Sequence, residues 1–445
     1  MSLHSISSRR IKKAVFVLLG VIVVSISSGC ATNVSHYQQI EQSLVNENHE
    51  KVIQLLEKAR EKGSYEEKDR VLYSLELGLA QHYAGLYEDS NNRLSRADQY
   101  IDDLYTKSIS NMGYSFLTNS SQLPYRGEPH ENIYLNAFKA FNYAQIGKPQ
   151  DVFVEVRKLD NKLGRMETEF KRMAEDYKQS AVSSLGEDFA PPDDKASFEA
   201  GETKFHTSAL GRYLGYVMYL TERDQDDARI DLNKMREAFQ NQPGIYNFDF
   251  PDIPESVDVP SGKARVNVFA LLGRGPIKKQ KTVRAQYKDV YVKWVYPVLQ
   301  ERGTSIDRVV VERNGRRVAQ LDEIEDINRV SKAIFEVKQP IIKAYNFVRA
   351  LSKALAAREA RQNSNTGLVG FAASVAAQEF TENADLRTTR LLPGEVHVGH
   401  FTVPDGELVD LTVNYYADGK RVDSRKIKQK FHRGKPNFLE VVNFK

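Results

Sequence analysis

The feature that most constrains how this chain folds is its single cysteine, Cys30, among 445 residues. One cysteine cannot form an intrachain disulfide, so even in an oxidising compartment the fold must be held by packing alone. The hydrophobic content of 41% and the charged content of 27% are those of a folded globular protein. Because the chain is too long for one hydrophobic core, we expect two or three domains, with the body of the protein in water.

The first 29 residues have the pattern of an export signal. Four basic residues precede an apolar run over residues 14–24, and the segment contains no acidic residue. Small residues then lead to Gly29 and Cys30. A positive start, an apolar middle and small residues at the end are typical of a secretory signal. The run is shorter than the roughly 20 apolar residues that a transmembrane helix needs.

The end of this segment, Ser27-Ser28-Gly29-Cys30, resembles the lipobox of bacterial lipoproteins, although Ser27 stands where the lipobox prefers Leu. The resemblance implies that residues 1–29 are a lipoprotein signal peptide, and that Cys30 carries a diacylglycerol and a further acyl chain such as palmitate. Several acyl chains make a stable membrane anchor. Ala31, by resemblance to enterobacterial sorting, implies an outer-membrane anchor facing the periplasm. The alternatives are an ordinary secretory signal with a free thiol and an uncleaved anchor.

The charge balance gives no indication of a nucleic-acid partner. The chain has 63 Lys and Arg against 59 Asp and Glu, and four of the basic residues lie in the signal, which leaves 59 of each sign. A mature chain without net charge has no overall basic field that would attract nucleic acid or anionic lipid. We therefore expect no nucleic-acid partner.

Residues 30–240 have the periodicity of an α-helical repeat domain. Over residues 77–97 the small and large residues, among them Gly78 and Leu94, follow the spacing of tetratricopeptide helix pairs. Glycine lets two helices approach closely, and leucine fills the groove between them. An earlier unit covers residues 52–59 and a later one covers residues 136–159. The alternative is an irregular helical bundle.

Two sets of side chains within this domain have both a structural and a functional interpretation. Glu128 and Glu131 stand close to the start of a helix expected near Asn132, where the helix dipole favours acidic groups. Their functional alternative is an acid/base pair. Tyrosines at every third position over residues 213–219 indicate packing on one helix face, and their functional alternative is a ligand site.

The second half of the chain has a different pattern, which makes the predicted fold class α+β. We expect a linker over residues 241–260, a mixed α/β region over 261–390 and a C-terminal antiparallel β region, a sheet or a sandwich, over 391–445. The Gly-rich stretch at 273–279 lacks the spacing of a phosphate loop and indicates a turn. Expected strands cover residues 264–272, 291–295, 308–312, 317–320, 395–403, 408–416, 421–431 and 438–444. Expected helices cover residues 324–361, bent or broken near Pro340, and 367–377.

No set of residues predicts catalysis. The sequence has no nucleophile elbow, zinc signature or convincing carboxylate pair. His397 and His400 fall on opposite faces of their predicted strand, because strand side chains alternate, so they do not form a metal-binding pair. We expect no enzyme activity, no catalytic residues, no cofactor and no metal site.

Several motifs together resemble an uncharacterised family of bacterial outer-membrane lipoproteins with tetratricopeptide-like repeats. The most specific is Ala384-Asp385-Leu386-Arg387, followed by Leu391-Leu392-Pro393, although Thr389 stands where the family has an aromatic residue. The others lie at residues 78–97, 125–157 and 273–279. The resemblance implies architecture and location but no catalytic residues. Genes of the family often lie near small lipoproteins that assist penicillin-binding proteins, which implies partners in cell-wall synthesis.

These patterns predict a lipid-anchored periplasmic scaffold or adaptor of the cell envelope that binds protein partners through its helical repeats. The alternative is a module that binds envelope glycan or lipid through the C-terminal β region. Asp385 and Arg387, two residues apart in an extended chain, point to one side. They form either a contact site for a partner or an ion pair that holds the approach to the C-terminal strands.

Overall fold

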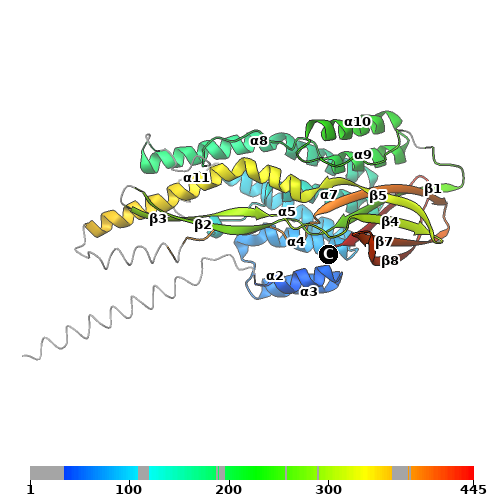
Figure 1. Cartoon of the computed structure of the whole chain (residues 1–445), viewed down its shortest axis with the longest axis horizontal. Coiled ribbons are helices and arrows are strands. Elements are labelled where there is room, and N and C mark those ends of the chain that lie inside the picture. Colours follow the sequence, from blue (N-terminus) through cyan, green and yellow to red (C-terminus); the bar gives the residue numbers. More distant parts are fainter. Residues whose placement is uncertain are drawn as a thin grey trace, which may run out of the picture.

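The computed structural model describes residues 35–108, 120–186, 189, 196–255, 258–287, 290–362, 379 and 382–445. These residues form an α+β fold, as predicted, with helices first and a curled, largely antiparallel sheet towards the end (Figure 1). The α-helices are α2 (Tyr37–Val45), α3 (His49–Glu61), α4 (Arg70–Tyr83), α5 (Tyr87–Ser108), α7 (Pro129–Gln145), α8 (Pro149–Leu185), α9 (Ala209–Glu222), α10 (Gln225–Asn241) and α11 (Ile327–Gln362). The strands are β1 (Lys263–Leu272), β2 (Ile277–Tyr287), β3 (Val290–Gln300), β4 (Arg308–Arg313), β5 (Arg316–Asp326), β6 (Glu395–Pro404), β7 (Leu408–Ala417), β8 (Lys420–Lys430) and β9 (Phe438–Asn443).

The helices from α2 to α10 pack as successive pairs. The pairs are α2 with α3, α4 with α5, α7 with α8, and α9 with α10, and neighbouring pairs meet where α3 packs on α4, α5 on α7 and α8 on α9. Each pair therefore covers the apolar face of the next, which is how helical repeats bury a continuous core.

One predicted close contact within these pairs is present. A Cβ atom at Gly78 of α4 would lie 2.7 Å from the Leu94 side chain of α5. The Ser90 hydroxyl donates a hydrogen bond of 2.7 Å to the Gly78 carbonyl across the same contact. Glycine is needed here because α4 and α5 touch without room for a methyl group. Tetratricopeptide geometry in the strict sense stays a prediction.

All the strands except β2 and β3 belong to a single seven-stranded sheet with the order β8-β7-β4-β5-β6-β1-β9, so this sheet contains strands from both sides of residue 391. β6 lies between β5 and β1 and is antiparallel to both. The expected mixed region 261–390 and the expected C-terminal region 391–445 are thus interleaved. β9 runs parallel to β1, whereas the other strand pairs of this sheet are antiparallel. An alternating strand pattern indicates which face is buried but does not identify the neighbouring strand.

Helix α11 and the separate two-stranded sheet β2–β3 extend together away from the large sheet (Figure 1). Trp294 on β3 packs against Phe347 on α11, with ring centroids 4.9 Å apart. The helix continues through Pro340, where a bend or break was expected. The Pro340 carbonyl accepts a hydrogen bond of 3.3 Å from the amide of Ser197. The expected helix over residues 367–377 lies outside the described residues.

The largest hydrophobic core joins the helices to the sheet. Phe269 on β1 contacts Phe141 on α7, Tyr213 on α9 and Phe438 on β9, with centroid distances of 5.0, 5.5 and 4.8 Å respectively. All four rings are buried. Alternate β1 residues, such as Val268, enter a second core on the other face of the sheet. From Val268 onward β1 is therefore apolar on both faces, as a strand covered on both sides should be, whereas Arg265 and Asn267 are buried polar residues of its first half.

The segment expected as a linker, residues 241–260, packs into the same core. Ile245, Tyr246 and Ile253 are buried among the residues of that core. The Tyr246 hydroxyl donates a hydrogen bond of 2.9 Å to Glu325 at the end of β5. This segment thus connects the helical part to the sheet through side-chain contacts as well as through the backbone.

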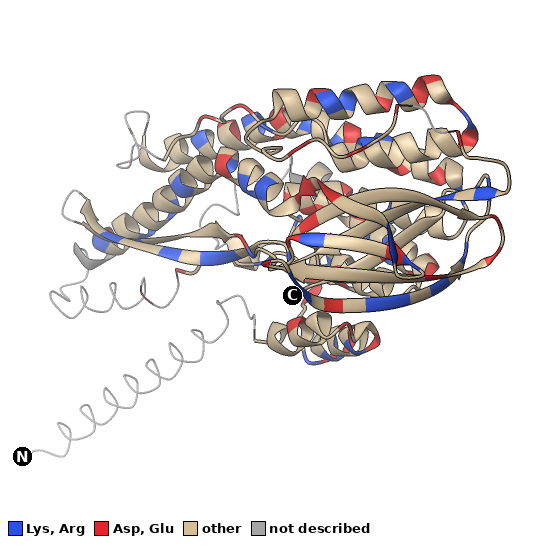
Figure 2. Cartoon of the chain, turned by 45° about the vertical axis from the view of Figure 1, so that its right-hand side comes forward, with Lys and Arg blue, Asp and Glu red and all other residues tan. Residues whose placement is uncertain are grey.

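β8 is an edge strand of the large sheet, and it carries Lys and Arg along much of its length (Figure 2). Such charges discourage another strand from pairing with the exposed edge. None of the described helices is both long enough and apolar enough to cross a membrane.

Candidate functional site

A polar cleft of about 580 Å³ lies between the first half of α8 and the α9–α10 pair. Phe153, Arg157 and Asp160 line it from α8, Arg212 and Tyr219 from α9, and Ile230, Asp231 and Lys234 from α10. The cleft is formed where α8 meets the next helical pair, so it depends on the stacking of successive pairs.

The base of the cleft is an ion-pair network around Arg212. The guanidinium lies 2.7 Å from Asp160 and 3.2 Å from Asp231, which connects all three helices. Burial raises the pKa of Asp231 to about 6, although Arg212 opposes the shift. A Cβ atom at Gly215 would lie 2.2 Å from an Asp231 carboxylate oxygen. Glycine at this position therefore lets α10 approach α9 closely enough to form the network.

Two basic side chains at the rim of the cleft form no ion pair with the other described residues. Arg157 and Lys234 are exposed, and neither forms a side-chain ion pair or hydrogen bond with another described residue. Phe153 and Tyr219 contact each other with ring centroids 4.6 Å apart. Ile230 is 48% exposed. The cleft thus offers two cations, Arg157 and Lys234, beside apolar and aromatic surface, and the carboxylates of Glu222 and Asp227 also line it.

The three tyrosines of α9 have different environments. Tyr213 and Tyr216 are buried in the core between helices and sheet, as the packing interpretation predicts. Tyr219, one turn further, reaches the cleft. The periodic pattern indicated the helix face correctly, but the last tyrosine lies where that face leaves the core.

Asp385 and Arg387 lie inside the molecule. Arg387 is 5% exposed, and its guanidinium lies 2.7 Å from Asp385 and 3.0 Å from Asp69. It also donates hydrogen bonds of 2.9 Å to the carbonyls of Ser120 and Leu123. The motif therefore attaches the chain before β6 to the first helices. This geometry supports the structural interpretation of the pair over the partner-contact interpretation.

Glu128 and Glu131 form a capping box at the start of α7, which begins at Pro129, earlier than expected. Glu128 pairs with Lys278 on β2 and Lys338 on α11. Burial alone would raise the pKa of Glu128, but these two ammonium groups hold it below its usual range.

Glu131 is the second carboxylate of this capping box, and it accepts hydrogen bonds from residues of the segment before β6. The Thr388 hydroxyl and the Thr389 amide donate to it at 2.8 and 2.6 Å. Both carboxylates therefore hold elements together. The sequence predicted that both carboxylates lie near a helix start, but neither the capping box nor these distant partners.

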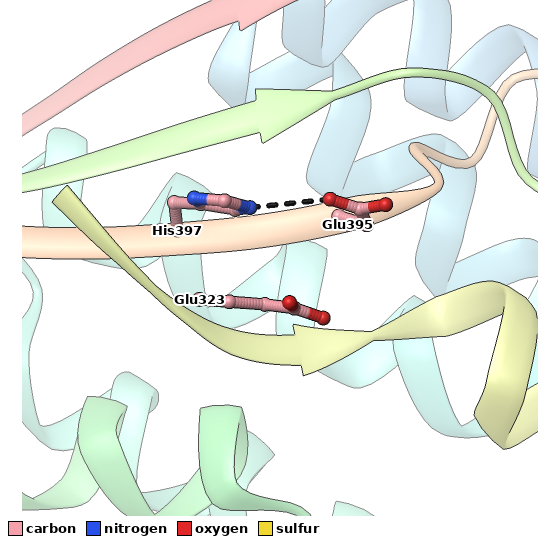
Figure 3. A group of neighbouring side chains, drawn as sticks. All are labelled: Glu323, Glu395 and His397. Carbon is pink, nitrogen blue, oxygen red and sulfur yellow. Dashed lines mark hydrogen bonds and ion pairs between the residues drawn. The ribbon is translucent and has the colours of Figure 1, made fainter. Parts of the chain in front are cut away.

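A further group of polar side chains lies on strands β5 and β6 and includes no residue of the cleft (Figure 3). Glu395 and His397 are two residues apart on β6 and point to the same face, and Glu323 is opposite His397 on β5. One ligand atom from each of the three residues lies within 4.8 Å of the others, a grouping that suits a metal ion. Burial, and then the neighbouring carboxylates of Glu395 and Asp326, raise the pKa of Glu323 to about 8.

The sequence predicts no metal site, because His397 and His400 fall on opposite faces of their strand. The sequence signal that could have found the group is the spacing of two between Glu395 and His397, which puts both side chains on one face of a strand. The third member, Glu323, becomes adjacent only through the pairing of β5 with β6.

Cys30, the predicted acylation site, lies outside the described residues. Comparisons with family models, curated proteins and solved structures found no match for this chain. By its fold, the chain is an α+β protein in which stacked helical pairs are joined to a mixed sheet.

Proposed function

We propose that this protein is a lipid-anchored scaffold of the bacterial cell envelope that binds a protein partner in the cleft between α8 and α9–α10. The observation that carries the proposal is that two basic side chains at the rim of this cleft form no ion pair with the other described residues. Arg157 and Lys234 are exposed cations that form no ion pair or hydrogen bond with another described residue, and they lie beside the Phe153–Tyr219 contact and exposed Ile230. Lys234 is near enough to Asp160 and Asp231 for its charge to act on both. The sequence supports the location through its export signal and the lipobox-like end at Cys30.

The two cations of the rim favour an extended partner segment that carries an acidic side chain next to an apolar one. Glu222 and Asp227, which also line the cleft, favour a basic or polar group elsewhere on the same segment. Arg212 at the base already faces two carboxylates, so it is not free to bind an anion. Arg157 and Lys234 form no ion pair with another described residue, and pairing with both would add electrostatic attraction to the apolar contact on Ile230. A cleft this polar is less suited to an apolar small molecule, because ligand pockets for those are lined mainly by hydrophobic side chains.

The test is crosslinking in intact envelopes followed by recovery of the protein with its partner. We expect one stoichiometric protein with the wild type, retained with Lys178→Glu and lost with the double change Arg157→Glu and Lys234→Glu. Lys178 is an exposed lysine of α8 outside the cleft, so it controls for the change of charge. Recovery should also fall with salt, since exposed ion pairs are screened.

Two outcomes would contradict the proposal. Equal recovery with the cleft variant and the control would place the contact elsewhere on the molecule. Retention on purified envelope glycan, with no stoichiometric protein, would favour the alternative of a glycan-binding module. Because both rim residues are exposed, their substitution should leave the melting temperature unchanged, which separates lost binding from lost folding.

A further inference from the structure

We propose that Glu323, Glu395 and His397 form a binding site for one divalent transition-metal ion, with Zn²⁺ as its representative. The three residues lie on the sheet and share no residue with the cleft, so this inference does not depend on the proposed function. It concerns metal binding alone.

The backbone holds the three side chains on one face of the sheet. β6 lies between β5 and β1, so the residues project from a central part of the sheet rather than from a loop. Glu395 and His397 are two residues apart on β6, and Glu323 is directly opposite His397. A bulge between Glu323 and Glu325 turns Glu325 to the opposite face, where it accepts hydrogen bonds from Tyr134 and Ser208. The bulge thus separates a structural carboxylate from the metal-binding group.

The distances are close to those that one ion requires. Zn²⁺ binds nitrogen and carboxylate oxygen at about 2.0–2.2 Å, so two of its ligands lie at most about 4.4 Å apart. The three ligand atoms already lie within 4.8 Å of one another. Small side-chain rotations would close the site without movement of the strands.

Glu323 forms no ion pair with another described residue, although the charge of Arg329 opposes the rise in its pKa. One Glu323 carboxylate oxygen is shielded from solvent and has no hydrogen-bond partner. Asp326 adds a third carboxylate opposite Glu395, and the nearby Arg329 pairs with Asp326 at 2.9 Å. Shielding a carboxylate oxygen without a partner is costly. A divalent cation would supply that partner and offset the repulsion between Glu323 and Glu395.

The ligand types select among cations. Mg²⁺ and Ca²⁺ prefer sites made entirely of oxygen, whereas an imidazole favours first-row transition metals such as Zn²⁺. On metal binding, the hydrogen bond of 3.2 Å between His397 and Glu395 would be replaced by coordination of both side chains to the ion. Three protein ligands leave a fourth position for water or for a ligand group from another molecule.

The test is a Zn²⁺ titration of the untagged, purified full-length chain, in competition with a chromophoric chelator. We expect saturable binding of one Zn²⁺ per chain and a rise of the melting temperature with Zn²⁺. His397→Ala and Glu323→Gln should each weaken binding by about tenfold or more. The matched control is His400→Ala, on the same strand but outside the group, and it should bind as the wild type does. Mg²⁺ and Ca²⁺ should compete poorly.

Three results would overturn the proposal. One is the absence of saturable Zn²⁺ binding by the wild type, which would leave an ordinary Glu–His ion pair. Another is equal loss in His397→Ala and His400→Ala, which would place the ion elsewhere. The last is equal competition by Mg²⁺ or Ca²⁺. Circular dichroism of each variant without metal separates lost binding from lost folding, and Glu323→Gln preserves side-chain volume if His397→Ala does not fold.

Discussion

At the scale of single residues, Glu76 is the clearest source of pH-dependent stability. It is fully buried on α4 and accepts hydrogen bonds from Tyr37, Tyr65 and the amide of Arg390. Burial raises its pKa from 4.5 to about 8, although the two tyrosine hydroxyls oppose the shift and Glu131 adds to it. At a pH below the pKa that Glu76 has in the unfolded chain, its contribution to the free energy of unfolding is fully present. It is lost as the pH rises through the folded pKa, because the unfolded carboxyl releases its proton first.

We therefore expect Glu76→Gln to gain stability relative to the wild type as the pH rises from about 5 to about 8, by up to about 1.4 kcal/mol per pH unit. Glutamine keeps a carbonyl acceptor for the tyrosines but cannot ionise. Urea denaturation across this range measures the difference. Glu407→Gln, at an exposed position, is the control. Parallel pH curves for Glu76→Gln and the wild type would contradict the assignment.

Arg387 provides a test of the structural interpretation of the motif at residues 384–387. Arg387→Ala would leave Asp69 and Asp385 without their shared buried partner, and breaking a buried pair in this way costs about 3–5 kcal/mol. We expect a loss of this size in the free energy of unfolding, measured in urea, and little change for the exposed Arg421→Ala. Unchanged stability combined with reduced partner recovery would restore the contact-site interpretation.

Cys30 carries the prediction about the anchor. Cys30→Ser should accumulate as unprocessed precursor and lose labelling by a fatty-acid analogue, because a hydroxyl does not replace the thiol that is acylated. Gel mobility and label incorporation in growing cells measure both effects. Labelling that persists in the variant would rule out acylation at this residue.

At the scale of elements, the contact between α4 and α5 depends on Gly78. A methyl group there would lie 2.7 Å from Leu94, so Gly78→Ala should destabilise the chain by about 1–3 kcal/mol, as overpacking does. Gly164 on α8 has open space around it, and Gly164→Ala should stabilise the helix by up to about 1 kcal/mol. Thermal melts of the two variants should shift in opposite directions. A stabilising Gly78→Ala would mean that the helices are not in this contact.

At the scale of the whole molecule, the core around Phe269 makes helices and sheet one cooperative unit. Phe269→Ala removes the ring that contacts α7, α9 and β9, and a change of this kind costs about 3–5 kcal/mol. We expect amide hydrogen exchange to accelerate in α7 and α9 as much as in β1. Val422→Ala, at a residue that is 52% exposed, is the control. Faster exchange in the sheet alone would indicate two independent domains.

The sequence by itself determined the features that depend on residues close together in the chain. The α+β class and most of the helices and strands follow from periodicity. The contact of Gly78 with Leu94 and the cap formed by Glu128 and Glu131 depend on residues close in the chain. Such features are determined by backbone preferences and side-chain spacing within a few turns, so one stretch of sequence is enough to predict them.

Only the tertiary structure decided which distant elements meet. The alternation in β6 showed two faces, but the packing of the whole chain placed Glu323 beside His397 and put β6 between β5 and β1. The packing of distant elements likewise made Asp69 the partner of Arg387 and brought Arg157 and Lys234 to one cleft. Many strand and helix pairings satisfy the same local pattern, and the choice among them depends on the summed packing free energy of residues far apart in sequence.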